Sequence, residues 1–341
     1  MIKNFIKNIS PKLFSALPIN ILISLSREKM IFPFYHTVSD TAMPHIKHLY
    51  KPKSIAEFKS DIDFFLKYYS PATINEVEKF IANKKRSKKP QFFLSFDDGL
   101  RENYEIIAPV LKEKGIQAAF FINSAFVDNK QLFHKYKCSL LIDALLQIYD
   151  IKKITDIAKL LGTNNYNIEQ ITKIIRDLNY SDLETIDKIA KILNVKFNEF
   201  LSKNKPYLTT EQILELSSQG FIIGAHSVDH PEFFLIGEKD QKIQIIDSLI
   251  FLEKLGIKKR YFAFPFTDYK VKATVFDIFT NGAKNIISFG TAGIKRDMTN
   301  LHIQRIPMED DKLDDAKSRI RKEYSYYLLK SLVGKNKLSR K

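Results

Sequence analysis

The chain has 341 residues, of which 45% are hydrophobic and 27% charged, a composition that is ordinary for a folded globular protein. Its net charge is +15, but the basic residues are spread along the chain without a recognisable nucleic-acid-binding motif, so no nucleic-acid partner is expected. The single cysteine, Cys138, excludes an intramolecular disulfide and is expected to be a small core residue of a helix.

The first 30 residues are expected to form an amphipathic lead-in. An apolar run over residues 13–25 follows a basic start, but Pro18 and Asn20 interrupt it and it is too short to span a bilayer. No small-residue cleavage site follows before Arg27, so a signal peptide is not predicted. The segment is expected to pack on the domain or rest on a membrane surface. We therefore expect a cytoplasmic protein, with peripheral membrane contact left open as well as the oligomeric state.

Apolar strand patterns and amphipathic helix patterns alternate through most of the remaining chain. Strands are expected near residues 31–36, 91–96, 117–123, 221–226, 261–266, 285–289 and 301–308. Helices are expected near residues 54–69, 103–114, 209–219, 239–255 and 271–279. This repeated order predicts an α/β fold with a parallel sheet, closed or nearly closed into a barrel.

One long segment interrupts this order. Residues 134–205 show four helical patterns and no strong strand, which predicts a helical insertion between the two barrel parts, 31–133 and 206–325. Because the insertion follows a strand end, we expect it to form a lid or wall over the substrate cleft. The lysine-rich end, residues 326–341, is expected to be a loose basic tail.

Two adjacent aspartates, Asp97 and Asp98, end the apolar strand that starts at residue 91. Two unpaired carboxylates in a dry site would cost several kcal/mol or force one of them to hold a proton. A helix cap would account for one aspartate but not for both. The pair therefore indicates a functional site at the end of this strand.

Two histidines end a second apolar strand. His226 and His230 are spaced i and i+4, which places both on one face if the chain turns helically after the strand. Together with a strand-end aspartate they suit zinc or a neighbouring divalent ion.

Residues 95–99 (SFDDG) and 226–231 (HSVDHP) resemble the first two motifs of polysaccharide deacetylases of the NodB-homology type, carbohydrate esterase family 4. The resemblance implies a distorted (β/α) barrel of about seven strands. It also implies that Asp97 is the general base and that the metal ligands are Asp98, His226 and His230. The implied cofactor is a divalent metal, Zn²⁺ first, with Co²⁺, Ni²⁺ or Mn²⁺ as alternatives.

Residues 261–269 (YFAFPFTDY) resemble a third motif of that family, which supplies a backbone N–H to the oxyanion. By position the donor is Phe266, and Pro265 and Phe266 are expected to contact substrate. Thr267 stands where the family usually has glycine. Asp268 is expected to orient the base or contact sugar.

The later motifs depart from the family pattern. The arginine that often holds the base is missing from the third motif, and a chain without tryptophan cannot carry the fourth. In the last strand, residues 301–309 (LHIQRIPME), the candidates for a residue of the site are His302, Arg305 and Glu309. Strict alternation puts His302 and Arg305 on opposite faces, and we favour Arg305. His36, at the end of the first strand, is a further candidate for the general acid.

The resemblance implies metal-dependent hydrolysis of N-acetyl groups on amino sugars of a bacterial surface polysaccharide or its lipid-linked precursor. A catalytically silent glycan-binding relative and a hydrolase of another C–N bond are the alternatives.

Overall fold

The computed structural model describes residues 17–82, 89–257, 260–280, 285–309 and 315–340. Its centre is a parallel sheet in the order β11-β9-β8-β7-β6-β5-β2-β12. These strands are β2 (Pro33–Tyr35), β5 (Leu94–Phe96), β6 (Ala118–Ile122), β7 (Ile222–Ala225), β8 (Tyr261–Ala263), β9 (Ile287–Gly290), β11 (His302–Gln304) and β12 (Ile306–Pro307).

One short stretch of chain joins the two edges of this sheet. Only Arg305 separates β11, which pairs with β9, from β12, which pairs with β2. The sheet is therefore a nearly closed barrel. Because the eight strands include two from this single stretch, the expectation of about seven strands is confirmed.

Helices cover the outside of the barrel. They are α3 (Ile55–Tyr68), α4 (Ile74–Ile81), α5 (Ala108–Glu113), α11 (Thr210–Ser218), α12 (Glu238–Lys254) and α13 (Ala273–Thr280). A π-helical turn, η1 (Asn103–Ile107), leads into α5. Helix α3 begins after Ser54, which forms a capping box with Glu57. Two shorter sheets, β1 (Met30–Ile31) with β4 (Gln91–Phe92) and β3 (Ser70–Pro71), and β10 (Arg296–Asp297) with β13 (Lys337–Leu338), lie beside the barrel.

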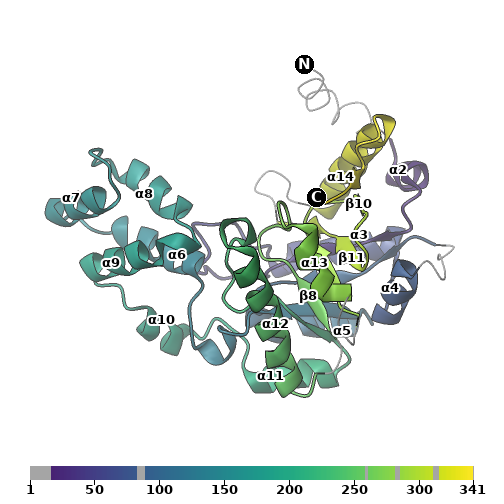
Figure 1. Cartoon of the computed structure of the whole chain (residues 1–341), viewed down its shortest axis with the longest axis horizontal. Helices are drawn as coiled ribbons and strands as arrows, with labels where there is room; N and C mark the ends of the chain where they lie inside the picture. Colours follow the sequence, from purple (N-terminus) through teal and green to yellow (C-terminus); the bar gives the residue numbers. More distant parts are fainter. Residues whose placement is uncertain (1–16, 83–88, 258–259, 281–284, 310–314, 341) are drawn as a thin grey trace.

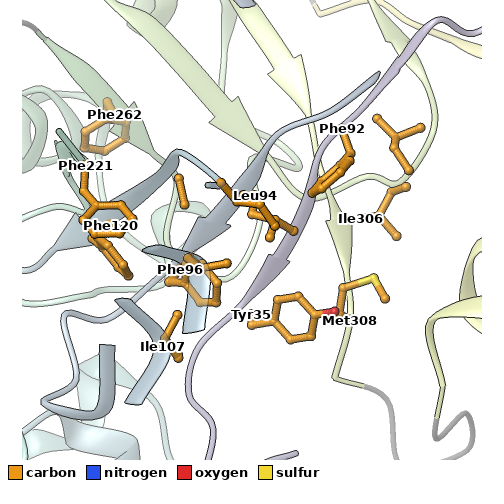
Figure 2. Close-up of a cluster of buried hydrophobic side chains, with 14 of the residues drawn as sticks. Tyr35, Phe92, Leu94, Phe96, Ile107, Phe120, Phe221, Phe262, Ile306 and Met308 are labelled. Atoms are coloured by element: carbon orange, nitrogen blue, oxygen red, sulfur yellow. The ribbon is translucent and has the colours of Figure 1, made fainter. Parts of the chain in front are cut away.

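The core follows from strand alternation. Leu94 and Phe96 point outward into a layer of buried side chains beneath the helices (Figure 2). Phe93, on the opposite face, joins an inner cluster with Phe121 and Phe289. Asp97 continues this inner face, so the period of the strand aims its carboxylate into the barrel.

The insertion is helical, as expected, with one helix more than the sequence patterns indicated. It holds α6 (His134–Leu145), α7 (Ile151–Leu160), α8 (Ile168–Asp177), α9 (Leu183–Leu193) and α10 (Phe197–Asn204). These helices have an apolar cluster of their own, which includes Cys138. In Figure 1 they extend to one side of the barrel, away from α2 (Ile19–Ser26) and α14 (Ala316–Leu332).

The basic end of the chain is ordered, which corrects the expectation of a loose tail. Helix α14 continues to Leu332, and within the segment 326–340 it buries Tyr327. After it, β13 pairs with β10. The burial of Tyr327 and the pairing of β13 with β10 account for the difference, and the lysine content of the segment gives no sign of either.

Residues 1–16 of the expected lead-in lie outside the described part of the chain. Helix α2 packs on α14, and Ile19, Leu22 and Ile23 are buried there. Among the helices of the described ranges, none combines the length and apolar character that a membrane crossing needs.

Candidate active site

Asp97 is paired with Arg305 inside the barrel. Nη1 and Nη2 of the arginine donate to the two carboxylate oxygens at 2.7 and 2.8 Å, and Nη1 also donates to Ser95 Oγ at 3.0 Å. Burial raises the pKa of Asp97, but the positive charge of Arg305 and its hydrogen bonds outweigh it and hold this pKa below the usual value. Asp97 is therefore ionised at neutral pH, and the last strand supplies the arginine that the third motif lacks.

Arg305 is itself fully buried and fixed from several sides. Its Nε donates to the Gly290 carbonyl at 3.2 Å, and its guanidinium carbon lies 4.3 Å from the ring centre of Phe34 and 5.3 Å from that of Phe121. A buried guanidinium that is stacked and fully paired holds the carboxylate in one orientation.

Asp98, His226 and His230 converge beside Asp97. Their ligand atoms all lie within 4.8 Å of one another, with Asp98 Oδ1 3.5 Å from His226 Nε2 and 3.2 Å from His230 Nε2. Asp98 Oδ1 is buried, and no hydrogen-bond donor reaches it from the residues that the structure places. An orphaned buried oxygen between two imidazole nitrogens fits a divalent cation.

The tautomer of His226 also suits a metal ligand. Its Nδ1 lies 2.8 Å from the Ala263 carbonyl, which can only accept, so Nδ1 carries the proton and Nε2 is free. Burial lowers the pKa of His226 to about 4, which keeps the ring neutral at pH 7.

Tyr136, on α6 of the insertion, holds the other oxygen of Asp98. Its hydroxyl donates to Asp98 Oδ2 at 2.9 Å. This contact leaves Oδ1 free to face the two imidazole nitrogens and makes the insertion part of the site. Tyr136 is not predictable from the sequence, because no local pattern links it to Asp98, which lies 38 residues earlier.

The loops that carry these groups contain left-handed backbone. Asp98 and Ser227 have φ of 71°, His230 has 62° and Phe266 has 52°. A residue other than glycine pays about 1–3 kcal/mol for such a conformation, and such residues cluster at functional sites. Ser227 Oγ accepts the His230 N–H at 3.0 Å and so stabilises the turn between the two histidines.

His36 lies at the same end of the barrel and pairs with Glu309. The His36 N–H donates to Glu309 Oε1 at 2.8 Å, and the imidazole Nδ1 contacts Oε2. Burial opposes the charged imidazolium, but Glu309 outweighs it and raises the pKa of His36 to about 10. His36 is therefore protonated at neutral pH.

One cavity of about 480 Å³ is lined by His36, Asp97, Asp98, His226 and His230. Phe34, Tyr50 and Phe133 form aromatic walls, and Lys135 and Arg176 come from the insertion. The insertion thus forms one wall of the cavity, which is the position that the lid-or-wall expectation requires.

The third-motif residues divide between the cavity and its surroundings. Phe266 lines the cavity, where its ring centre lies 4.6 Å from that of His230. Pro265 is absent from the cavity lining. Asp268 was expected to orient Asp97 or to contact sugar, but it lies on the outer face of the sheet, outside the cavity lining, where it accepts hydrogen bonds from His302 and Gln304. Strand alternation accounts for this position, because His302 and Gln304 face outward while Arg305 faces inward.

The comparisons with known proteins agree with this geometry. The family model for polysaccharide deacetylase matches residues 84–278, more than half of the 341 residues. No curated protein matches the chain.

Several solved structures share the fold. The Streptococcus pyogenes deacetylase PplD, in complex with acetate, is 14% identical, with a TM-score of 0.55 over 86% of this chain and 98% of that one. IcaB from Ammonifex degensii is 16% identical, with a TM-score of 0.53 over 86% and 97%. A de-N-acetylase from Aggregatibacter actinomycetemcomitans is 14% identical, with a TM-score of 0.50 over 81% and 94%. From the match to its family model, this chain belongs to the polysaccharide deacetylase family and is a deacetylase.

Proposed function

We propose that the protein removes N-acetyl groups from amino sugars of a bacterial surface polysaccharide or its lipid-linked precursor, with a divalent metal as cofactor. One observation carries the proposal: Asp97, kept ionised by Arg305, lies beside three converging metal-ligand groups in one cavity. The fold shared with a de-N-acetylase supports the N-acetyl group as the target.

Asp98, His226 and His230 would hold the metal, most plainly Zn²⁺, with Co²⁺, Ni²⁺ or Mn²⁺ as alternatives. When bound, the ion would polarise the acetyl carbonyl and acidify the attacking water. Asp97 takes the proton of that water as the general base. Arg305 holds both Asp97 oxygens through two hydrogen bonds, which restrain rotation of the base during the transfer.

Two further groups serve the later steps. The backbone N–H of Phe266, on the cavity edge, would donate to the oxyanion, a contribution of about 3–4 kcal/mol in other hydrolases. His36, protonated and backed by Glu309, would give a proton to the leaving amine. This assigns the general acid to the first strand, since the last strand offers His302 only on its outer face.

The test is acetate release from a panel of N-acetylated glycans, with and without a chelator. We expect release that the chelator abolishes and that added Zn²⁺ restores. Asp97→Asn should keep the metal and lose turnover, while Asp63→Asn, on the exposed surface of α3, should match the unmodified protein. Tight glycan binding without acetate release would favour a silent relative, and release of another amine would indicate a different C–N bond.

A further inference from the structure

A buried polar cluster lies on the outer face of the sheet, around Asp268, and the proposed reaction leaves it without a role. Asp268 is only 3% exposed. Its carboxylate accepts hydrogen bonds from Gln304 Nε2 at 2.7 Å and from His302 Nε2 at 3.1 Å. Asp297 brings a second carboxylate, which accepts from the same Gln304 Nε2 at 2.9 Å. Two carboxylates that share a donor in a buried site repel each other, and a cation between them offsets this repulsion.

Arg340 is that cation. Its Nη2 donates to Asp297 Oδ2 at 2.7 Å and also contacts Asp268 Oδ2, while Nη1 donates to the Asp268 backbone carbonyl at 2.8 Å. The guanidinium lies 4.3 Å from the ring centre of Phe276, and the side chain is only 9% exposed. A planar fork of donors suits this bridge, which one ammonium group could not reproduce.

The cluster reaches Phe266 through Thr291. The Thr291 N–H donates to Asp268 Oδ1 at 3.2 Å, and its hydroxyl donates to the Phe266 carbonyl at 3.1 Å. Phe266 has a φ of 52°, a conformation that persists only where the surroundings impose it. Asp268 is two residues further on, so the cluster fixes both the carbonyl of Phe266 and the chain that follows it.

The cluster also touches the strand end that holds Arg305. A Cβ on Gly290 would lie 2.6 Å from the Asp268 carboxylate, so only glycine allows this approach. The same Gly290 carbonyl accepts from both the backbone N–H and Nε of Arg305, at 3.1 and 3.2 Å. The outer cluster therefore packs directly behind the groups that hold the base.

We propose that Arg340 is a positioning residue, which acts through Asp268 and Thr291 to hold Phe266 in its left-handed conformation at the cavity edge. The inference rests on the proposed function, because the Phe266 N–H matters for rate only if an oxyanion forms. Arg340 touches neither the cavity nor the metal-ligand groups. Its loss should therefore lower kcat far more than it raises KM, and Asp98, His226 and His230 should keep their capacity to bind metal.

The first test is chemical rescue. Arg340→Ala should lower kcat by about 10- to 100-fold, the range expected for a displaced donor. Guanidinium, added far below concentrations that unfold proteins, should occupy the vacated site and restore kcat, whereas sodium chloride at equal ionic strength should not. Arg340→Lys, which keeps the charge but not the fork, should recover little. Lys337→Ala removes a charge from β13 without touching the cluster and should match the unmodified protein.

The second test does not need activity. Hydrogen exchange in the peptide 264–271 should speed up in Arg340→Ala and slow again with guanidinium. Unmodified protein that releases no acetate would sink the proposed function, yet this exchange would still show whether Arg340 holds the loop. Unchanged exchange overturns the inference. So does a fall in kcat that guanidinium leaves unrepaired in a folded variant.

Discussion

Replacing Arg305 by glutamine tests the central pair of the site. The substitution keeps a polar side chain but removes the charge and both hydrogen bonds to Asp97. Arg305 is fully buried, so water does not take over its role. We expect two effects: a higher pKa for the base and a less stable fold.

The magnitudes follow from the geometry. Breaking a buried ion pair by removing one partner costs about 3–5 kcal/mol, because the other charge is left uncompensated. One pKa unit corresponds to about 1.4 kcal/mol, so a loss of about 3 kcal/mol raises the pKa of Asp97 by about two units. Asp97 must be ionised to act as base, and the acid limb of kcat/KM should move to higher pH by this amount. The pKa of Asp97 is lower in the folded than in the unfolded protein, so this group stabilises the fold at pH values above its unfolded-state pKa. That stabilisation should also be lost in Arg305→Gln.

The assay is the pH profile of kcat/KM, together with urea unfolding at neutral pH. Arg260→Gln is the matched control, because it breaks an arginine–carboxylate pair with Glu253 that is partly exposed and remote from the cavity. In the double variant with Asp97→Asn, the loss of stability should be smaller than the sum of the two single losses. An acid limb that stays in place in Arg305→Gln would refute the assignment of Arg305 as the group that keeps the base ionised.

Two further predictions concern the other partners of the site. Glu309→Gln removes the charge that raises the pKa of His36 to about 10, so the alkaline limb of kcat/KM should move to lower pH. The His36–Glu309 pair contributes stability that is present below about pH 6.5 and is lost as pH rises through about 10. A pH series of unfolding curves should show that this contribution is absent from Glu309→Gln. An alkaline limb of kcat/KM that does not move would exclude His36 as the acid. Tyr136→Phe should weaken Zn²⁺ binding about 10- to 100-fold in chelator competition, because Asp98 loses its orienting hydrogen bond. Tyr166→Phe, on the exposed surface of the insertion, should bind as the unmodified protein does, and equal affinities in both variants would contradict the role of Tyr136.

The sequence was sufficient to predict the barrel and the convergence of Asp98, His226 and His230, and the reason is local. Asp97, Asp98 and His226 each follow a buried strand directly, and parallel strands bring such ends to one edge. His230 follows at a spacing that the turn after β7 brings back to the same point. Each of these positions needs only the strand pattern and a short turn.

The partners of these groups could not be predicted in the same way. Glu309 meets His36 across 273 positions of sequence, and Tyr136 meets Asp98 from a helix outside the barrel. Such contacts depend on how whole elements pack, which no local pattern records. The position of Asp268 just after the third motif predicts contact with Asp97 or with sugar. The chain turns after Phe266, however, and Asp268 therefore lies on the outer face of the sheet.

The stretch from His302 to Pro307 explains how a chain without the usual third-motif arginine can hold Asp97 in place. The stretch joins both edges of the barrel. Its inner face contacts Asp97 at the end of β5, and its outer face contacts Asp268 in the loop after β8. Strand alternation then divides two tasks between neighbouring residues: Arg305 fixes Asp97 from inside, while Gln304 fixes Asp268 from outside. A shift of one residue in the register of this stretch would exchange the two faces and lose both contacts together. The pairing of Ile306 with Pro33 is therefore as necessary for the site as the side chains themselves.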